Sequence, residues 1–497
     1  LAKADLPLAF RQAESTQVPQ WLNSDEEAKT MHFPWVQAEG SMSKRLVAAC
    51  LVLFCTVGAA AEDPVFDLET ILSTPLNARV LKRTEKEGIV TEEVQYHSET
   101  DGEKAVEIYG FFSYPVGAEK LPAFIWNQSG LSKASDYYTK FGARRGYAAL
   151  CIDFPIPGYR STGGYRINSG LELTADPREA PIYHGAVALL KAVSFLRSRA
   201  EVDPDRIGMC GSSWGGFYTT MMAGIDPRLK AASAMFGCGG LQLGNSWWRG
   251  SGEWTVSKET RNRWARTLDP AHRLGQHPIA TAWFSGTNDH FYWMPALMHT
   301  YRSAGQPRHL SLFPNWNHGL PPEGDEQVFE WLDVHLKGAR PFNSVTPLRL
   351  ENLEGRPHAV WQTAGPRTID RAELIVSYGD AGNWEGRCWT PRPARIEAGV
   401  CRAVLPKSPV PYYVGGAVID GNGFRYSTAL KRVDPAEHGL ADPNAPLEYN
   451  GCRMWGGFEE KQVEFLSRNG TLRPAVSKNA HAGKQSVVLK GGKVVLR

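Results

Sequence analysis

A serine in a strand-to-helix turn is the strongest chemical signal in the sequence. Ser213 lies in the stretch Gly211-Ser-Ser-Trp-Gly215, between a predicted strand at Ile207–Cys210 and a predicted helix at Gly216–Gly224. The G-x-S-x-G spacing places a serine on a sharp turn and exposes its hydroxyl, because the glycines let neighbouring backbones pass close by. Such a short pattern also occurs by chance, so the candidate partners of Ser213 decide what it means.

Two candidate partners follow later in the chain, each just past the end of a predicted strand. Asp289 ends the stretch Gly-Thr-Asn-Asp, and His318 lies in Asn-Trp-Asn-His-Gly. In open α/β sheets, reactive groups gather at the carboxyl ends of the strands. His318 would take the proton of Ser213, and Asp289 would orient the imidazole. We predict a Ser213–Asp289–His318 triad; His290 is the less favoured alternative base.

Backbone amides near this turn could stabilise a developing oxyanion. The amide of Trp214 would lie at the start of the helix that follows Ser213. A second donor would come from the loop after a predicted strand at Pro122–Trp126, and Gln128 and Ser129 are the candidates. The alternative is that this loop is only a turn, capped by Asn127.

Two long insertions, at residues 155–181 and 239–278, are predicted to overhang the site. Long loops in compact domains are usually functional. Both insertions carry aromatic side chains, and aromatic faces stack on sugar rings and acyl groups alike. The alternative is that these side chains only pack the cap. The predicted substrate-binding residues are Tyr159, Arg160, Trp247, Trp248 and Trp254. Cysteine spacing typical of metal sites is absent from the sequence, and we predict no metal and no cofactor.

Three predicted strands between residues 78 and 114 are expected to pair antiparallel. From about residue 122 to 336, strand-like and helical stretches alternate, which is typical of a parallel sheet covered by helices. We therefore predict an α/β fold, with a mostly parallel eight-stranded sheet and helices on both faces, over residues 62–340. Cys151, Cys210 and Cys238 lie in or beside apolar runs and are predicted to be buried thiols.

Short strands separated by Gly/Pro turns follow, which predicts a small β-sandwich over residues 341–434. Cys388 and Cys401 flank a predicted hairpin and could form a cross-strand disulfide. The predicted strands are Ala359–Thr363, Ala372–Tyr378, Gly386–Thr390, Val400–Leu405, Tyr412–Ile419 and Phe424–Lys431.

The N-terminal region, residues 1–61, is predicted to be a leader with a secretion signal. Met42 is followed by two basic residues, an apolar run from Leu46 to Val57 and a small-residue cleavage site. We expect translation from Met42, cleavage near Ala61/Glu62, and a secreted or periplasmic product. An unusual buried helix is the alternative for this stretch.

The last segment, residues 435–497, is predicted to be a linker followed by part of a jelly roll. Gly457-Phe-Glu-Glu460 and His481-Ala-Gly-Lys-Gln-Ser-Val-Val488 resemble the opening strands of a galactose-binding-like carbohydrate-binding module. Since the remaining residues are too few to close such a sandwich, we expect a truncated reading frame.

The net charge of +3 on 497 residues gives no reason to expect nucleic acid or a membrane surface as a partner. Twelve mostly apolar residues in the signal are too few to span a bilayer. We therefore expect no nucleic-acid partner and no stable membrane insertion.

Residues 75–338 resemble α/β-hydrolases of the acetyl xylan esterase, cephalosporin-C deacetylase and dienelactone hydrolase group, and also the catalytic domains of prolyl oligopeptidases. The sequence departs from these families where Asn127-Gln128 replaces the usual HG, where Asp153–Gly158 replaces RGQG, and at Gly319. The resemblance is carried by Gly211–Gly216, Asp226–Ala232, Gly286–Asp289 and Asn317–Gly319.

The resemblance implies a serine ester hydrolase that works through an acyl-enzyme, with a small ester or acylated carbohydrate as substrate. A serine peptidase of the prolyl oligopeptidase type is the first alternative, since it shares the triad. A non-catalytic carbohydrate-binding protein on the same scaffold is the second.

Overall fold

The structure, a computed structural model, describes residues 65–165, 171, 173–249, 254–379, 382, 384–447, 487–490 and 493–496. The predicted leader and signal segment and most of the predicted jelly-roll segment lie outside these residues. Within the described part of the chain, no helix is long and apolar enough to cross a membrane.

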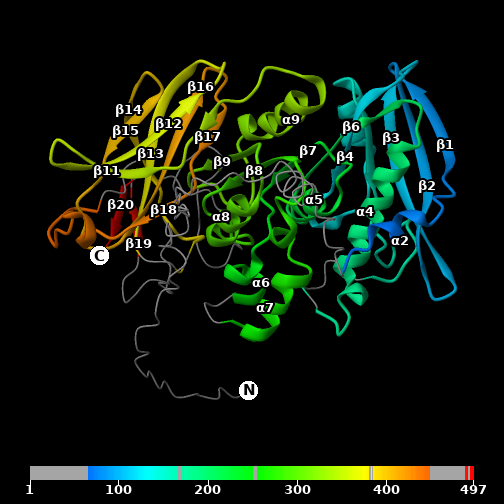
Figure 1. Cartoon of the computed structure of the whole chain (residues 1–497), viewed down its shortest axis with the longest axis horizontal. Helices are drawn as coiled ribbons and strands as arrows, with labels where there is room; N and C mark the ends of the chain where they lie inside the picture. The colour runs from blue at the N-terminus through cyan, green and yellow to red at the C-terminus, as the bar shows by residue number, and fades with distance from the viewer. Residues whose placement is uncertain are drawn as a thin grey trace, which may run out of the picture. The chain divides into compact units, whose positions relative to one another are not determined.

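The first sheet, whose strands run from blue to green in Figure 1, has helices packed beside it. It has nine strands in the order β1-β2-β3-β5-β4-β6-β7-β8-β9, one more than predicted. The first three strands pair antiparallel, and β4 to β9 pair parallel. The strands are β1 (Arg79–Lys86), β2 (Ile89–Asp101), β3 (Lys104–Pro115), β4 (Leu121–Asn127), β5 (Ala148–Ile152), β6 (Val202–Ser212), β7 (Ala231–Met235), β8 (Ala280–Gly286) and β9 (Arg308–Phe313).

Helices cover both faces of this sheet, so the predicted fold class is confirmed. On one face, α3 (Asp136–Arg144) and α9 (Pro322–Lys337) are joined by Arg145, which pairs with Glu326 at 2.7 Å and with Asp333 at 2.9 Å. On the other face, α4 (Pro181–Arg197) and α5 (Trp214–Ile225) contact each other. Strands β5, β7 and β8 are buried throughout, as expected for parallel strands covered on both faces.

Further short helices belong to the two insertions and to the segments around the sheet. The insertion at 155–181 contains η3 (Pro177–Glu179). The insertion at 239–278 contains η4 (Leu241–Leu243), α6 (Ser246–Arg249), α7 (Lys258–Thr267) and η5 (Pro270–Arg273). Outside the insertions lie α2 (Leu68–Ser73), η2 (Ser129–Leu131), α8 (Met294–Ser303) and η6 (Ala436–His438).

The C-terminal strands form a second, antiparallel sheet that folds back on itself. Strand β14 pairs with β13 through its first half and with β15 through its second half. Trp361 of β12 packs on Gly416 of β16 inside the fold, although these two strands do not pair. The strands are β10 (Ser344–Val345), β11 (Arg349–Leu353), β12 (Arg356–Ala364), β13 (Ile369–Tyr378), β14 (Thr390–Glu397), β15 (Val400–Val404), β16 (Tyr412–Asp420), β17 (Arg425–Ser427) and β18 (Lys431–Val433). Separately, β19 (Val487–Lys490) pairs with β20 (Lys493–Leu496).

Two predictions for this sheet are wrong. Residues 386–389 are irregular, and the strand begins only at Thr390. The predicted Cys388–Cys401 disulfide does not form, since Cys388 is disulfide-bonded and Cys401 is a free, buried thiol. The register gives the reason: Ile396 lies opposite Cys401 in the β14–β15 hairpin, and Cys388 precedes the hairpin. Cys151, Cys210 and Cys238 are buried free thiols, as predicted.

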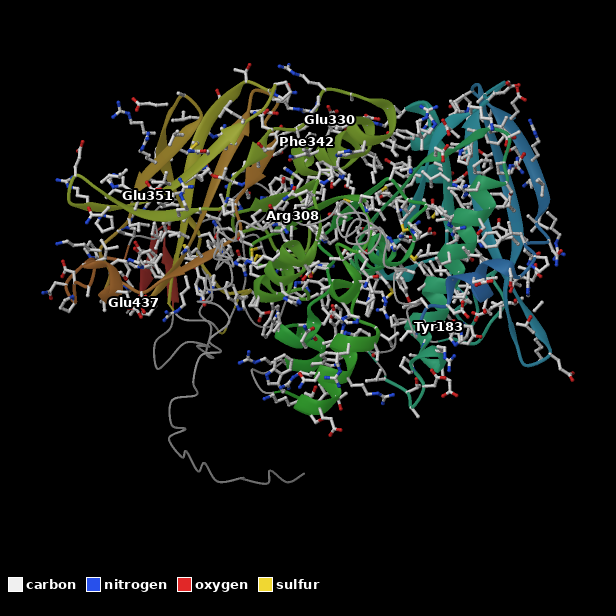
Figure 2. The ribbon with its side chains drawn as sticks, in the orientation of Figure 1. Tyr183, Arg308, Glu330, Phe342, Glu351 and Glu437 are labelled. Atoms are coloured by element: carbon white, nitrogen blue, oxygen red, sulfur yellow. The ribbon has the colours of Figure 1, made fainter. Side chains whose placement is uncertain are left out.

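A joint of aromatic and charged side chains connects α9 to the C-terminal sheet. Phe342 is labelled in Figure 2. Its ring contacts Trp331 of α9 and also Phe424 and Tyr426 of the C-terminal sheet. Arg367 lies over the Phe342 ring.

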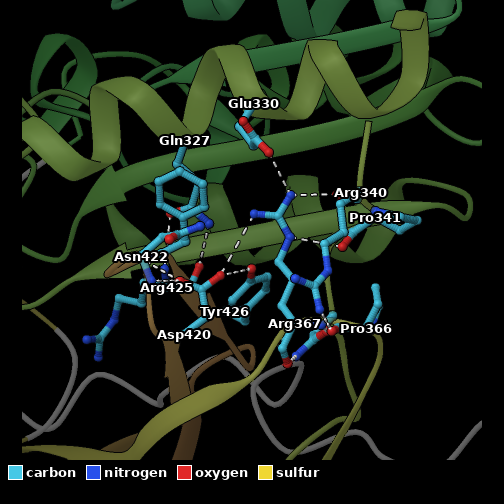
Figure 3. A network of polar contacts seen from close by, with 12 residues as sticks. Gln327, Glu330, Arg340, Pro341, Pro366, Arg367, Asp420, Asn422, Arg425 and Tyr426 are labelled. Carbon is cyan, nitrogen blue, oxygen red and sulfur yellow. Dashed lines mark hydrogen bonds and ion pairs between the residues drawn. The ribbon is translucent and has the colours of Figure 1, made fainter. Parts of the chain in front are cut away.

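The charged groups of this joint are satisfied by one another (Figure 3). Arg367 pairs with Glu330 at 2.8 Å and with Asp420 at 3.8 Å. A shallow cavity here is lined by Glu330, Arg340, Arg367, Thr368, Asp420, Gly421 and Asn422. Because its buried charges are already paired, we interpret this cavity as part of the joint.

Candidate active site

Ser213 occupies a strained turn between β6 and α5. Its backbone angles are φ 57° and ψ −121°, a conformation that L-residues rarely adopt. The turn is tight because Asn127, at the end of β4, lies against it. A Cβ atom added at Gly215 would lie 2.1 Å from the Asn127 carbonyl oxygen, and one at Gly211 would lie 2.6 Å from it. Only glycine fits at these two positions.

The structure brings Ser213, His318 and Asp289 into one hydrogen-bonded chain. The distance from Ser213 Oγ to His318 Nε2 is 2.7 Å, and His318 Nδ1 lies 2.8 Å from Asp289 Oδ2. Because an ionised carboxylate only accepts hydrogen bonds, Nδ1 carries the proton and Nε2 faces the serine hydroxyl with its lone pair. This arrangement is suited to removing a proton from Ser213.

Asp289 is held in place by the turn that follows it. It is 1% exposed, and its Oδ1 accepts the N–H groups of Phe291 at 2.8 Å and Tyr292 at 2.9 Å. Burial, reinforced by the charge of Asp289, raises the pKa of the nearby Cys238 thiol and of the Tyr292 hydroxyl well above their usual values. Both groups therefore stay neutral beside the Asp289–His318 pair.

The alternative base, His290, points to a different partner. Its Nδ1 is hydrogen-bonded to Asn317 Oδ1, and its ring centre lies 5.6 Å from that of His318. Asn317 Oδ1 also accepts the backbone N–H of His318 at 2.7 Å and that of His290 at 3.2 Å. Asn317, to which the sequence analysis gave no role beyond its place in the motif, thus links the Asp289 and His318 loops.

The candidate oxyanion residues border the turn. Trp214 is the first residue of α5, so its amide lies at the positive end of the helix dipole. Gln128 and Ser129 follow directly on Asn127, the residue packed against the turn, and Ser129 begins η2. The Gln128 side chain accepts a hydrogen bond from Trp126 Nε1 at 3.2 Å. The role of these three residues in binding an oxyanion stays a prediction.

Aromatic rings surround His318. The rings of Phe236 and Phe291 lie 4.7 and 4.8 Å from the imidazole, centre to centre. Trp247 stacks on Phe291 at 5.4 Å and contacts Trp214 at 5.2 Å. Phe236 was missed in the sequence, although it directly follows the last residue of β7, where functional groups were expected for other strands.

The other cap tryptophans do not join this cluster. Trp248 is 5% exposed and packs edge-to-face on Trp264, which is fully buried. Trp254 lies beneath the guanidinium groups of Arg261, at 3.8 Å, and Arg249, at 5.5 Å. Among the three tryptophans predicted to bind substrate, Trp247 is the one that the structure brings into the aromatic cluster around His318.

Tyr159 and Arg160, the substrate-binding residues predicted in the 155–181 insertion, contact the end of β5 and the segment before α3. Arg160 binds Asp153 through Nε at 2.9 Å and through Nη2 at 2.8 Å. Asp153 is fully buried, and Arg160 also donates to the Ala134 carbonyl at 2.7 Å. Tyr159 lies beneath the Lys133 ammonium group, 5.5 Å from it. The geometry assigns the guanidinium of Arg160 to holding the loop.

Residues 65–447, apart from the short undescribed stretches, contain no group of three His, Cys, Asp or Glu side chains arranged to hold a metal ion. The polar groups gathered at the turn are those of the Ser213–His318–Asp289 chain and the amides beside it.

The sharp turn that carries Ser213 between β6 and α5, with Asp289 after β8 and His318 after β9, is the arrangement of an α/β-hydrolase fold. The model of the "Dienelactone hydrolase family" matches residues 120–330, which contain all three residues of the predicted triad. The protein is a hydrolase of the carboxylesterase type.

Solved structures similar to this chain include three esterases. Acetyl xylan esterase from Paenibacillus sp. R4 is 20% identical, with a TM-score of 0.46, over 54% of this chain and 92% of that one. Acetyl xylan esterase 1 from Thermoanaerobacterium sp. JW/SL YS485 is 13% identical, with a TM-score of 0.43, over 53% and 89%. Glucuronoyl esterase from Solibacter usitatus is 13% identical, with a TM-score of 0.38, over 52% and 86%. A comparison with curated proteins finds no match.

Proposed function

We propose that the protein is a serine ester hydrolase in which Ser213, His318 and Asp289 act as a catalytic triad. The observation that carries the proposal is the unbroken hydrogen-bonded chain from Ser213 Oγ to Asp289, on a strained turn at the carboxyl end of β6. The family match over residues 120–330 supports it.

In the proposed mechanism, Ser213 Oγ attacks the acyl carbon while its proton passes to His318 Nε2. The charge that develops on the imidazole is stabilised by Asp289. The carbonyl oxygen, now negative, would be stabilised by the Trp214 amide and by an amide of Gln128 or Ser129. His318 then protonates the departing alcohol, and an acyl-Ser213 ester remains. Water, deprotonated by His318, releases the acid and restores the serine.

The first test is hydrolysis of 4-nitrophenyl acetate by the full chain and by Ser213→Ala. Removing a triad nucleophile lowers kcat by several orders of magnitude. The matched control is Ser212→Ala, which changes the neighbouring serine at the end of β6 and is expected to leave kcat within about threefold. In pre-steady-state kinetics, a burst of nitrophenolate equal to the enzyme concentration would report the acyl-enzyme. A Ser213→Ala variant as active as the wild type would refute the triad.

We further propose that the natural substrates are small acyl esters, including acetyl groups on polysaccharide. The aromatic cluster of Phe236, Phe291 and Trp247 beside His318 supports an apolar acyl group or a sugar face at this place. Acetate release from acetylated xylan is the expected result. Cleavage of Pro-containing peptides with no ester hydrolysis would favour the peptidase alternative. Sugar binding without turnover of either substrate would favour the binding-protein alternative.

We also propose that the protein is exported from the cytoplasm. The tripartite signal after Met42 supports it, and so does the disulfide at Cys388, since disulfides persist in oxidising compartments. Cell fractionation of an expressing host should place the protein outside the cytoplasm, with its N-terminus near Glu62. A full-length protein that stays in the cytoplasm would contradict this.

A further inference from the structure

Two asparagines on the triad loops are hydrogen-bonded to the C-terminal sheet domain. Asn288 directly precedes Asp289, and its Nδ2 donates to the carbonyls of Glu385 at 3.0 Å and Arg387 at 2.5 Å. Asn315 lies three residues before His318. Its Nδ2 donates to the Trp389 carbonyl at 2.7 Å, and its Oδ1 accepts the Trp389 N–H at 2.8 Å. Both asparagines are buried.

The same two loops are also bonded to each other. The Asn288 N–H donates to the Trp316 carbonyl at 2.9 Å, and the Asn315 N–H donates to Thr287 Oγ1 at 2.8 Å. The Thr287 hydroxyl in turn donates to Asn288 Oδ1 at 2.8 Å. Because this bond occupies Oδ1, Asn288 Nδ2 is the atom that faces the two carbonyls of the sheet domain. The loops and residues 384–389 therefore form one hydrogen-bonded junction.

Residues 384–389 are themselves fixed to the C-terminal sheet. Trp389 is fully buried, and Arg387 is 6% exposed. The Arg387 guanidinium donates to Ser377 Oγ at 3.3 Å and to the Gly379 carbonyl at 3.1 Å, at and just past the end of β13. The carbonyls of Glu385, Arg387 and Trp389 and the Trp389 N–H are thus hydrogen-bonded to the triad loops and not to a neighbouring strand.

We propose that residues 384–389 are a positioning element of the triad, and that they act through Asn288 and Asn315. This inference rests on the proposed function, because it assigns the C-terminal domain a role in that reaction. Asn315 has a φ of 62°, in the left-handed region that asparagine adopts more readily than most residues, and its two bonds to Trp389 hold this conformation. A displacement of about 1 Å in such a supporting residue can cost about 100-fold in rate.

The chain offers a matched control, a residue that attaches the C-terminal sheet but does not lie on a loop of the triad. Gln327 of α9 makes the same two-point contact with the C-terminal sheet, since its Nε2 donates to the Arg425 carbonyl at 2.9 Å and its Oε1 accepts the Arg425 N–H at 3.1 Å. Like the two asparagines, Gln327 is buried. It belongs to the joint on α9, however, and not to a loop that carries a triad residue.

The experiment compares three full-chain variants, Asn288→Ala, Asn315→Gly and Gln327→Ala. Glycine is chosen at 315 because it tolerates the left-handed φ. For 4-nitrophenyl acetate we expect kcat to fall about 10- to 100-fold in the two asparagine variants, with KM within about threefold. Gln327→Ala should keep kcat within about twofold, even if its melting temperature falls.

A second readout does not depend on turnover. The proton between His318 Nδ1 and Asp289 should give a low-field NMR resonance in the wild type and in Gln327→Ala, and this resonance should be broadened or lost in the asparagine variants. An unchanged kcat and an unchanged resonance in both asparagine variants would overturn the proposal, and so would equal losses in all three variants. If the wild type hydrolyses no ester, the proposed function fails, and the resonance alone still decides whether the segment positions the triad.

Discussion

At the scale of single residues, the site depends on how closely backbones can approach. The carbonyl of Asn127 lies against both glycines of the turn, so the end of β4 and the start of α5 are in direct contact there. This contact fixes where Ser213 points, and it also fixes the residues that follow Asn127, which are the candidate oxyanion donors. Glycine is therefore required at positions 211 and 215 for the proposed site to form.

Gly215→Ala should destabilise the protein and lower its esterase activity, since the new Cβ would lie 2.1 Å from the Asn127 oxygen. Overpacking of this kind costs about 1–3 kcal/mol, or more where backbone must move. The matched control is Gly319→Ala, next to His318, where no heavy atom lies within 4 Å of the new Cβ. Urea denaturation and 4-nitrophenyl acetate turnover measure both effects. Equal behaviour of the two variants would contradict this account of the turn.

At the scale of elements, the start of the 155–181 insertion is attached by an ion pair between Arg160 and the fully buried carboxylate of Asp153. Arg160 satisfies both oxygens of Asp153, and its guanidinium lies 4.2 Å from the ring of Tyr109. Asp153 Oδ1 also accepts the Ala134 N–H at 2.5 Å, at the entry to α3. One carboxylate thus connects the end of β5, the insertion and the segment before α3.

Arg160→Met should reduce the free energy of unfolding by about 3 kcal/mol, because it leaves the buried Asp153 carboxylate without its partner. KM for 4-nitrophenyl acetate should change little in the folded variant. Arg178→Met is the control: Arg178 forms a similar pair with Asp176, but both side chains are exposed, and no measurable loss of stability is expected. A raised KM with unchanged stability would instead support a substrate-binding role for Arg160.

At the scale of the whole molecule, the hydrolase sheet and the C-terminal sheet meet over a buried interface that contains an uncharged histidine. His309 of β9 lies between Trp331, Phe342 and Tyr426. His309 Nε2 is hydrogen-bonded to Ser311 Oγ at 2.8 Å, and Ser311 Oγ donates to the Arg425 carbonyl. Burial, and then the nearby charge of Arg367, lowers the pKa of His309 to about 3.

This histidine predicts a loss of stability in acid. The unfolded chain binds a proton at His309 below about pH 6.5, whereas the folded protein does so only near pH 3, so protons favour unfolding between these values. His335, whose pKa burial lowers to about 4, acts in the same direction. Each group should reduce the free energy of unfolding by about 1.4 kcal/mol per pH unit between about pH 6 and 4.5.

The stability that His309 and His335 contribute in their neutral forms is fully present above pH 6.5. Urea denaturation at a series of pH values measures its loss. His309→Asn should reduce the slope of the free energy of unfolding against pH by about 1.4 kcal/mol per pH unit. His335→Asn gives an independent second variant. An unchanged slope in both variants would show that other groups cause the acid sensitivity.

The sequence alone determined the fold class of the hydrolase domain and the candidate triad. Both follow from local patterns: strands and helices are visible in the spacing of apolar residues, and Ser213, Asp289 and His318 each follow directly on a predicted strand. Parallel strands end at the same edge of a sheet, so these local positions imply that the three residues meet. The structure brings them together, and their catalytic role remains the proposal to be tested.

Only the tertiary structure decided what the side chains outside the strands contact. A local pattern shows whether a residue tends to be buried, but not which partner buries it. The pairing of Arg160 with Asp153 and the separation of Trp254 from the triad both depend on segments that meet only in the folded chain. The attachment of Asn288 and Asn315 to residues 384–389 spans about 70 to 100 positions in sequence. Those residues resemble a strand in sequence, but they are irregular because their hydrogen bonds are made with another domain.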